Sequence, residues 1–185
     1  QHVADIDPVE MDSLELGFRG GKEKVNYNIT LFSMSKDNFI FRDTSRQNVD
    51  NGETEHQGIE LDMKMDLHEA VTASIAFTWA EHEYDNNPAL SATPLKGNTI
   101  DTAPETLGSM SIKWQVTPRQ THELEWVHIG KYYEDSGNRN EYEGHDLLHL
   151  RGNWSMNNNV QIFYKVMNIT DEDYAERADF SFGSD

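Results

Sequence analysis

The chain has 185 residues, which is enough for one domain with a sizeable core, and it contains no cysteine. Its formal net charge is -18, from 33 acidic and 15 basic residues, and this balance disfavours nucleic acid, whose phosphates attract basic surfaces. The composition therefore excludes disulfide frameworks, thiol catalysis and Cys-based zinc sites. Mean hydropathy is -0.75, and no stretch approaches the roughly 18 apolar residues of a transmembrane helix.

Apolar and polar residues alternate along several segments. Val25–Leu31 and Ile59–Leu67 place apolar side chains at odd positions and polar ones at even positions. Because side chains on a strand alternate between its two faces, each segment has one apolar and one polar side. The pattern predicts eight strands, at about 11–19, 23–34, 56–67, 70–81, 105–116, 121–132, 144–156 and 160–167.

Short turns and long polar connections alternate between these segments. We expect tight turns at 20–22, 67–70, 117–120 and 157–159, with long loops in between. This rhythm puts every turn at one end of an antiparallel sheet and every long loop at the other. Barrels of the bacterial outer membrane show this asymmetry, with short periplasmic turns and long extracellular loops.

The apolar side of the predicted sheet carries no charge through its middle in six of the eight strands. A Lys or Arg at the bilayer midplane costs about 2–4 kcal/mol, so an uncharged stripe fits contact with lipid. Trp114 and Trp154 lie near the turn end, and Trp79 and Tyr132 near the loop end, where interfacial aromatic girdles are expected. The sequence predicts an all-β, antiparallel, up-and-down transmembrane β-barrel segment.

A soluble β-sandwich or lipocalin-like binding module is the alternative, because its strands also alternate. Soluble strands are usually about 5–6 residues long, whereas several of these run roughly 10–12. A complete small outer-membrane barrel, acting as a passive pore or adhesin, is another alternative. The abundant acidic residues fit solvated loops, or an acidic rim that attracts cationic or metal-bearing ligands.

Several motifs resemble the C-terminal part of the barrel of TonB-dependent outer-membrane receptors. They are Asp7–Glu10 leading to Leu14–Gly17, Gly52 followed by Gly58–Leu61, Ala103–Glu105, and the segment Val166–Tyr174, which is similar to the family's V-x-N-L-T-D-x-x-Y. Gly58, Glu60, Asn168, Asp171 and Tyr174 correspond to family positions with a structural role. The order and spacing of the motifs span nearly the whole chain.

The resemblance implies a barrel of roughly 22 strands closed around a plug domain. Residues 1–185 would then be a partial barrel domain that lacks the plug and the final strand. We expect the gene to encode an upstream plug with a short TonB box and one further strand downstream.

The resemblance also implies active transport across the bacterial outer membrane, energised by the TonB complex through the plug. An iron–siderophore complex is the ligand expected from the family, and the partners are outer-membrane lipid, the TonB complex and this small ligand. Cobalamin, haem and oligosaccharides remain open as ligands. No enzyme activity, catalytic residue, metal ligand or cofactor is predicted.

Aromatic and imidazole side chains gather near the predicted loop end. His82, Tyr84, Tyr132, Tyr133 and His145 are the candidate ligand-binding residues. An interface girdle with solvated loops is the plainer explanation of the same residues. We expect His149 and Arg151 to point into the barrel lumen and to pair with charges of the plug or of the neighbouring wall.

Overall fold

The computed structural model of the protein describes residues 7–42, 48–176, 178–179 and 183–184. Every regular element in these ranges is a β-strand, and they contain no helix long and apolar enough to cross a bilayer. The strands are β1 (Glu10–Lys22), β2 (Val25–Arg42), β3 (Asn48–His68), β4 (Val71–Tyr84), β5 (Thr106–Thr117), β6 (Gln120–Ile129), β7 (Tyr132–Tyr133), β8 (Glu141–Tyr142), β9 (His145–Ser155), β10 (Gln161–Val166), β11 (Ala178–Asp179) and β12 (Gly183–Ser184).

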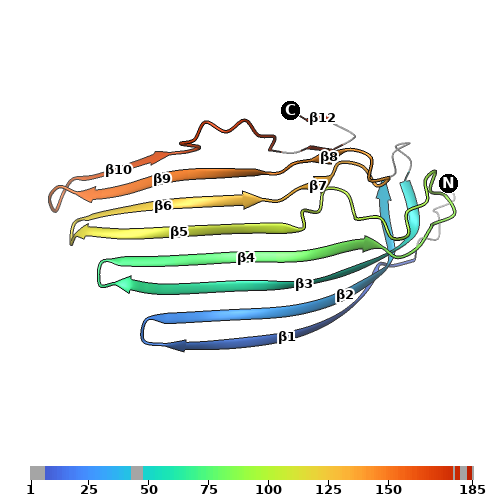
Figure 1. Ribbon diagram of the computed structural model, residues 1–185, viewed down its shortest axis with the longest axis horizontal. Coiled ribbons are helices and arrows are strands. Elements are labelled where there is room, and N and C mark those ends of the chain that lie inside the picture. The colour runs from blue at the N-terminus through green and yellow to red at the C-terminus, as the bar shows by residue number, and fades with distance from the viewer. Residues whose placement is uncertain (1–6, 43–47, 177, 180–182, 185) are drawn as a thin grey trace.

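Eight strands form one antiparallel sheet in the order β1-β2-β3-β4-β5-β6-β9-β10. Each strand pairs with the next one along the chain, and the β7–β8 hairpin is inserted between β6 and β9. Figure 1 shows the tight turns gathered at one end and the long connections at the other. The predicted all-β, up-and-down architecture of eight strands is confirmed, and within the described residues the sheet is open.

The four tight turns lie where the strands change direction at the turn end of the sheet. They are Glu23–Lys24, Glu69–Ala70, Pro118–Arg119 and Asn157–Asn159. The prediction of a turn at 20–22 was wrong, because these residues belong to β1 and Lys22 pairs with Val25. Neither glycine of that segment has a positive φ.

Gly20 serves a close approach rather than a turn. It lies opposite Tyr27, and a Cβ at Gly20 would collide with the tyrosine ring. The same arrangement recurs where Gly152 faces Tyr164, and a Cβ on Gly152 would lie 2.5 Å from the ring. An aromatic ring lying over a cross-strand glycine covers the backbone that the glycine leaves bare and helps to fix the register.

Two strands are much longer than the sequence predicts. β2 continues to Arg42 and β3 begins at Asn48, so the long loop expected after residue 34 was wrong. The ladder continues past register shifts between Lys36 and Phe41. Phe39 and Phe41 stack with ring centroids 6.0 Å apart, and Phe41 also packs on Tyr84. These aromatic contacts pack the tip of β2 against the tip of β4, in a region where apolar and polar residues no longer alternate.

The sixth strand is shorter than predicted. β6 ends at Ile129, and Tyr132 and Tyr133 form the separate strand β7. Gly130 lies between the two strands and donates its N–H to the Thr106 carbonyl of β5, and a Cβ there would collide with Thr106.

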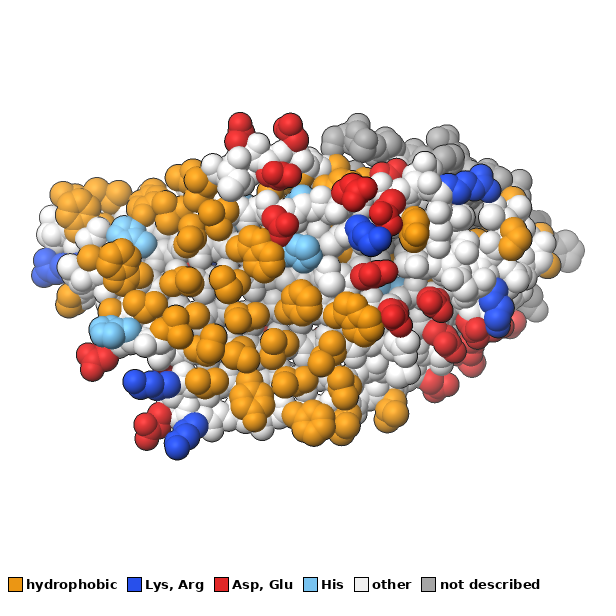
Figure 2. All heavy atoms as spheres, viewed as in Figure 1, with side chains coloured by type: hydrophobic (Ala, Val, Ile, Leu, Met, Phe, Trp, Pro, Cys, Tyr) orange, Lys and Arg blue, Asp and Glu red, His pale blue; other side chains and the backbone are white. Residues whose placement is uncertain are grey.

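One face of the sheet, the outer face, carries a continuous apolar belt (Figure 2). Apolar side chains form rows across neighbouring strands, such as Leu16–Leu31–Ile59–Trp79 and Ile75–Met110–Trp126–Leu148. Large side chains in this belt are exposed, with Leu14 at 75% and Leu16 at 55%. An apolar surface of this extent needs an apolar partner such as lipid.

The opposite face, the inner face, is polar at the same height. One of its rows is Lys113–Glu123–Arg151–Lys165, which crosses β5, β6, β9 and β10. Arg151 lies 2.7 Å from Glu123 and 3.2 Å from Glu125. Arg151 therefore faces the inner side, as predicted, and it pairs with charges of the neighbouring wall.

The largest fully buried side chains lie at the loop end of the sheet. Val49 and Leu95 are fully buried there, and Tyr84 is 2% exposed. Trp114 and Trp154 lie near the turns, and Trp79 lies in the belt row toward the loop end, in agreement with the predicted aromatic positions.

The belt can be tested at Ile75, which lies midway along the outer face of β4. We expect Ile75→Lys to lower the free energy of unfolding by about 2–4 kcal/mol, because the ammonium would lie in hydrocarbon. Denaturant titration of the full-length protein folded in lipid vesicles measures this value.

Ala76→Lys is the matched control. Ala76 is the next residue on β4, is exposed on the inner face, and lies opposite Asp62. We expect its free energy of unfolding to change by no more than about 0.5 kcal/mol. Equal losses in the two variants would contradict the assignment of the faces.

The glycine–tyrosine pair gives a second test. We expect Gly152→Ala to destabilise the protein by about 1–3 kcal/mol, because the new methyl group would displace the Tyr164 ring. The same denaturant titration applies, and the loss should shrink in a Tyr164→Ala background. Gly17→Ala is the control, because a Cβ at Gly17 has no neighbour within 4 Å. A loss of similar size at Gly17 would show that the effect is not specific to the pair.

Candidate functional site

The loop end of the inner face is built where β3 and β4 extend beyond the apolar belt. Gln57 and Glu81, on the outer face at this height, are joined by a 2.8 Å hydrogen bond. Charged and polar side chains on both faces mark this region as lying outside the lipid. The strand tips therefore present the inner face to water.

His82 forms a close pair with His56 at this level. The two residues are opposite each other in the β3–β4 register, and their Nδ1 atoms are 2.8 Å apart. The second nitrogen of His56, Nε2, is 3.0 Å from the Thr54 hydroxyl. Burial, with smaller contributions from His82 and Lys36, lowers the pKa of His56 to about 4, and burial also lowers the pKa of His82.

Tyr84 lies below the loop that follows β4. Its hydroxyl donates a 2.8 Å hydrogen bond to Asp101. Burial raises the pKa of the Asp101 carboxyl, and burial together with the nearby Asp101 charge raises the pKa of Tyr84. The pair anchors the end of the loop to the tip of β4.

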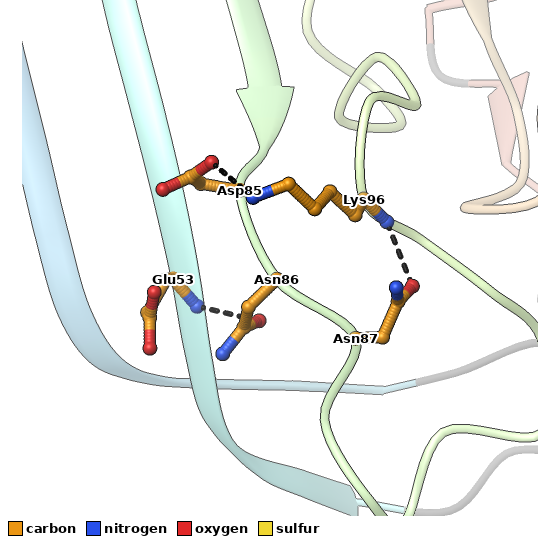
Figure 3. A network of polar contacts seen from close by, with 5 residues as sticks. All are labelled: Glu53, Asp85, Asn86, Asn87 and Lys96. Atoms are coloured by element: carbon orange, nitrogen blue, oxygen red, sulfur yellow. Dashed lines mark hydrogen bonds and ion pairs between the residues drawn. The ribbon is translucent and has the colours of Figure 1, made fainter.

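The long connection from residue 85 to 105 is fastened to the tip of β3 (Figure 3). Asn86 accepts a 3.1 Å hydrogen bond from the backbone of Glu53, and Lys96 reaches Asp85 at 3.1 Å. Asn87 accepts bonds from the backbone N–H groups of Leu95 and Lys96. These contacts fold the loop back on itself and bury Leu95.

A second loop, from residue 134 to 140, packs against the first. Asn138 exchanges two 2.8 Å hydrogen bonds with the backbone of Thr99. Asp135 is 2% exposed and accepts hydrogen bonds from the backbone of Gly137, Arg139 and Asn140 and from the Asn140 side chain. One buried carboxylate thus fixes the shape of this loop.

An aromatic cluster supports the far side of the loop end. Tyr132 and Tyr142 pack with centroids 5.2 Å apart, and His145 lies between Tyr142 and Tyr174. The Tyr142 hydroxyl is 2.8 Å from His145 Nδ1. Burial lowers the pKa of His145, although Asp146 and Glu172 act in the opposite direction.

The segment after β10 folds around Asn168, a family-motif residue. Asn168 has a φ of 48°, and its side chain accepts a hydrogen bond from the backbone of Glu172 and donates one to the carbonyl of the same residue. Its backbone N–H donates to Nδ1 of His149, which is buried on the inner face. Asp171, with a φ of 53°, donates its N–H to the Asn168 carbonyl.

Of the remaining motif residues, Tyr174 packs on His145, and Gly58 and Glu60 lie in β3. Gly58 faces Phe32 and Ala80, and its missing side chain leaves room for the Phe32 ring. Glu60 lies opposite Thr30 and Thr78, on the inner face.

The structure divides the five predicted ligand-binding residues into two groups. Tyr132 and His145 meet through Tyr142, with Tyr133 beside Tyr132 in β7, whereas His82 and Tyr84 lie on β4. The segment at residues 99–102 runs between them, because Ile100 donates its N–H to the His82 carbonyl and Thr102 donates to the Tyr133 carbonyl.

Sequence reasoning missed His56, Asp101, Asp135 and Tyr142, which complete these clusters. Counting back from the turn after β3 would place His56 opposite Glu83, and the register shift between Asp66 and His68 instead places it opposite His82, so the sequence alone does not pair the two histidines. Asp101, Asp135 and Tyr142 lie in irregular segments, where no period gives their direction.

The sequence matches the family model described as TonB dependent receptor-like, beta-barrel, over residues 2–169. No curated protein sequence matches the chain. The family match confirms the resemblance drawn from the sequence motifs.

Solved structures share the fold. They include the ferric yersiniabactin uptake receptor FyuA from Yersinia pestis (18% identity, TM-score 0.76, 89% of this chain and 25% of that chain). The ferric citrate transporter FecA in the unliganded form is similar (18%, 0.78, 91% and 28%). So is the copper transporter OprC (15%, 0.75, 93% and 26%). The chain spans about a quarter of the length of these proteins.

These receptors are transporters of the outer membrane and not enzymes, so the prediction of no enzyme activity is confirmed by the family. The motifs, the lipid-type outer face and the match over residues 2–169 agree, and the chain belongs to the TonB-dependent receptor β-barrel family.

Proposed function

We propose that this chain forms part of the wall and outer mouth of a receptor that takes up a ferric chelate across the bacterial outer membrane. The observation that carries the proposal is the combination of an apolar outer belt with a polar inner face and a structured, water-exposed loop end. Two of the similar solved structures are, by their titles, receptors or transporters of ferric compounds. The copper transporter makes copper the second candidate cargo.

Transport would be energised by the TonB complex acting on a plug domain inside the closed barrel. In this proposal, other parts of the protein would supply such a plug and the remaining strands of the barrel. The inner row with Arg151 and Glu123 is charged. It is suited to contact such a plug through polar interactions.

We propose that the five predicted residues act in two ways at the mouth. His82 and Tyr133 are partly exposed and can contact a ligand directly. Tyr84 and His145 are buried and Tyr132 accepts the backbone N–H of Ala178, so these three would support the loops from below.

Uptake by intact cells tests the proposal. Deleting the gene should abolish accumulation of one radiolabelled ferric chelate by iron-starved cells, and the full-length gene should restore it. The uptake should stop when TonB is removed. Uptake that continues without TonB would indicate a passive pore, and recovery of the protein in the soluble periplasm would reject the membrane assignment. Restoration of copper uptake instead would identify the second cargo.

The loop held by Asp135 gives a specific variant. Asp135→Ala removes the acceptor of four hydrogen bonds, so we expect the half-saturation concentration for uptake to rise by roughly 10-fold while the amount of protein in the membrane is retained. Glu143→Ala, at an exposed position three residues after the loop, is the control and should match wild type. Unchanged uptake by Asp135→Ala would show that this loop takes no part in ligand capture.

A further inference from the structure

Three metal-binding side chains share one row on the inner face at the loop end. Met34, His56 and His82 are direct register partners across β2, β3 and β4. Direct partners in a sheet point to the same face, and neighbouring strands are about 4.8 Å apart. We propose that this row binds a copper ion, with His56 and His82 as the nitrogen ligands of Cu²⁺.

The distance between the imidazoles carries the proposal. Two nitrogen ligands about 2.0 Å from one ion are about 2.8 Å apart at the right angle of a square-planar site, and about 3.3 Å apart at a tetrahedral angle. The Nδ1 atoms of His56 and His82 are 2.8 Å apart. The two rings share a hydrogen bond at this distance, and the same spacing suits both nitrogens to one tetragonal Cu²⁺ ion once the proton between them has moved.

The chemistry of the row also favours copper. Divalent copper binds nitrogen ligands more tightly than the other first-row ions, and a thioether suits Cu⁺. Met34, the register partner of His56 in this row, is the candidate third donor for the reduced ion. Zn²⁺ binds such nitrogen donors less tightly than Cu²⁺ does.

The surroundings leave the pair available to an ion. Both rings are partly exposed, and the polar residues on the outer face at this height place them above the lipid belt. The Thr54 hydroxyl at His56 Nε2 orients that ring, as partners of metal-bound histidines commonly do. Binding moves the proton between the two Nδ1 atoms to an Nε2 atom, so each imidazole stays neutral.

Two features limit the strength of the site. Lys36 repels positive charge at His56, although its ammonium lies over the Phe39 ring, 5.1 Å from the centroid. The described residues contain no group of three or more His, Cys, Asp or Glu side chains that could hold a metal ion. Water or an incoming chelator would complete the coordination, which fits an accessible mouth rather than a closed structural site.

Copper titration of the purified full-length protein in detergent tests the site. We expect one Cu²⁺ ion per protein at pH 7, with an electron paramagnetic resonance spectrum showing splitting from two nitrogen atoms. His56→Gln and His82→Gln should each weaken binding by at least about 10-fold. Zn²⁺ should bind at least about 10-fold more weakly than Cu²⁺ in wild type.

Matched variants separate the site from general copper binding. His128→Gln, on the outer face beside Asp146, should leave the Cu²⁺ affinity unchanged. Met34→Leu should weaken binding of Cu⁺, measured under ascorbate, and leave Cu²⁺ binding within about 2-fold. Circular dichroism confirms that each variant retains its strands. Equal Cu²⁺ affinity in wild type and in the double variant of His56 and His82, or a spectrum without nitrogen splitting, would overturn the proposal.

Discussion

The pairing of long antiparallel strands is the constraint on which the rest of this structure depends. Each strand between β1 and β10 satisfies its backbone N–H and C=O groups through its two neighbours, which lets one face of the sheet meet hydrocarbon. The pleat then sends alternate side chains to opposite environments. A row such as Ile75–Met110–Trp126–Leu148 and a row such as Lys113–Glu123–Arg151–Lys165 are two consequences of the same ladder. The sheet therefore does not depend on a buried hydrophobic core of the kind that a soluble protein has.

Above the belt the constraint on side chains relaxes while the ladder continues. β2 continues to Arg42, and β3 already begins at Asn48. The tips of both strands carry polar residues on both faces. Because lipid no longer covers one face, stability there comes from loops that pack on the tips. Leu95 and Val49 are buried at this end, and Asp135 holds its loop with four hydrogen bonds. The residues suited to bind a ligand lie at this end of the sheet, where the packed loops support them.

The sequence predicts well wherever lipid imposes a period of two. Strands such as β5 were placed to within a residue or so, because Met110, Ile112 and Trp114 must share the outer face. The predictions were wrong where the strands leave the lipid and the period of two ends. The strand tips beyond residue 34 look like a polar loop, and Gly20 looks like a turn although it accommodates the ring of Tyr27. The links of Asp101 to Tyr84 and of Tyr142 to His145 depend on loop geometry that no local pattern encodes.

A single irregularity beside one tight turn shows how much depends on register. His68 pairs with Val71 beside the turn. From Asp66 back to Thr54, the β3–β4 register is shifted by one residue. Without this bulge, His56 would face Glu83 and Ile59 would face Ala80. A slip of one residue exchanges the faces of a strand, so the same bulge aligns the apolar row at Ile59 and Trp79 and the imidazole pair at His56 and His82. The register that keeps the lipid-facing row unbroken at Ile59 and Trp79 therefore also places positions 56 and 82 opposite each other on the inner face, and the histidines at these two positions are the proposed copper ligands.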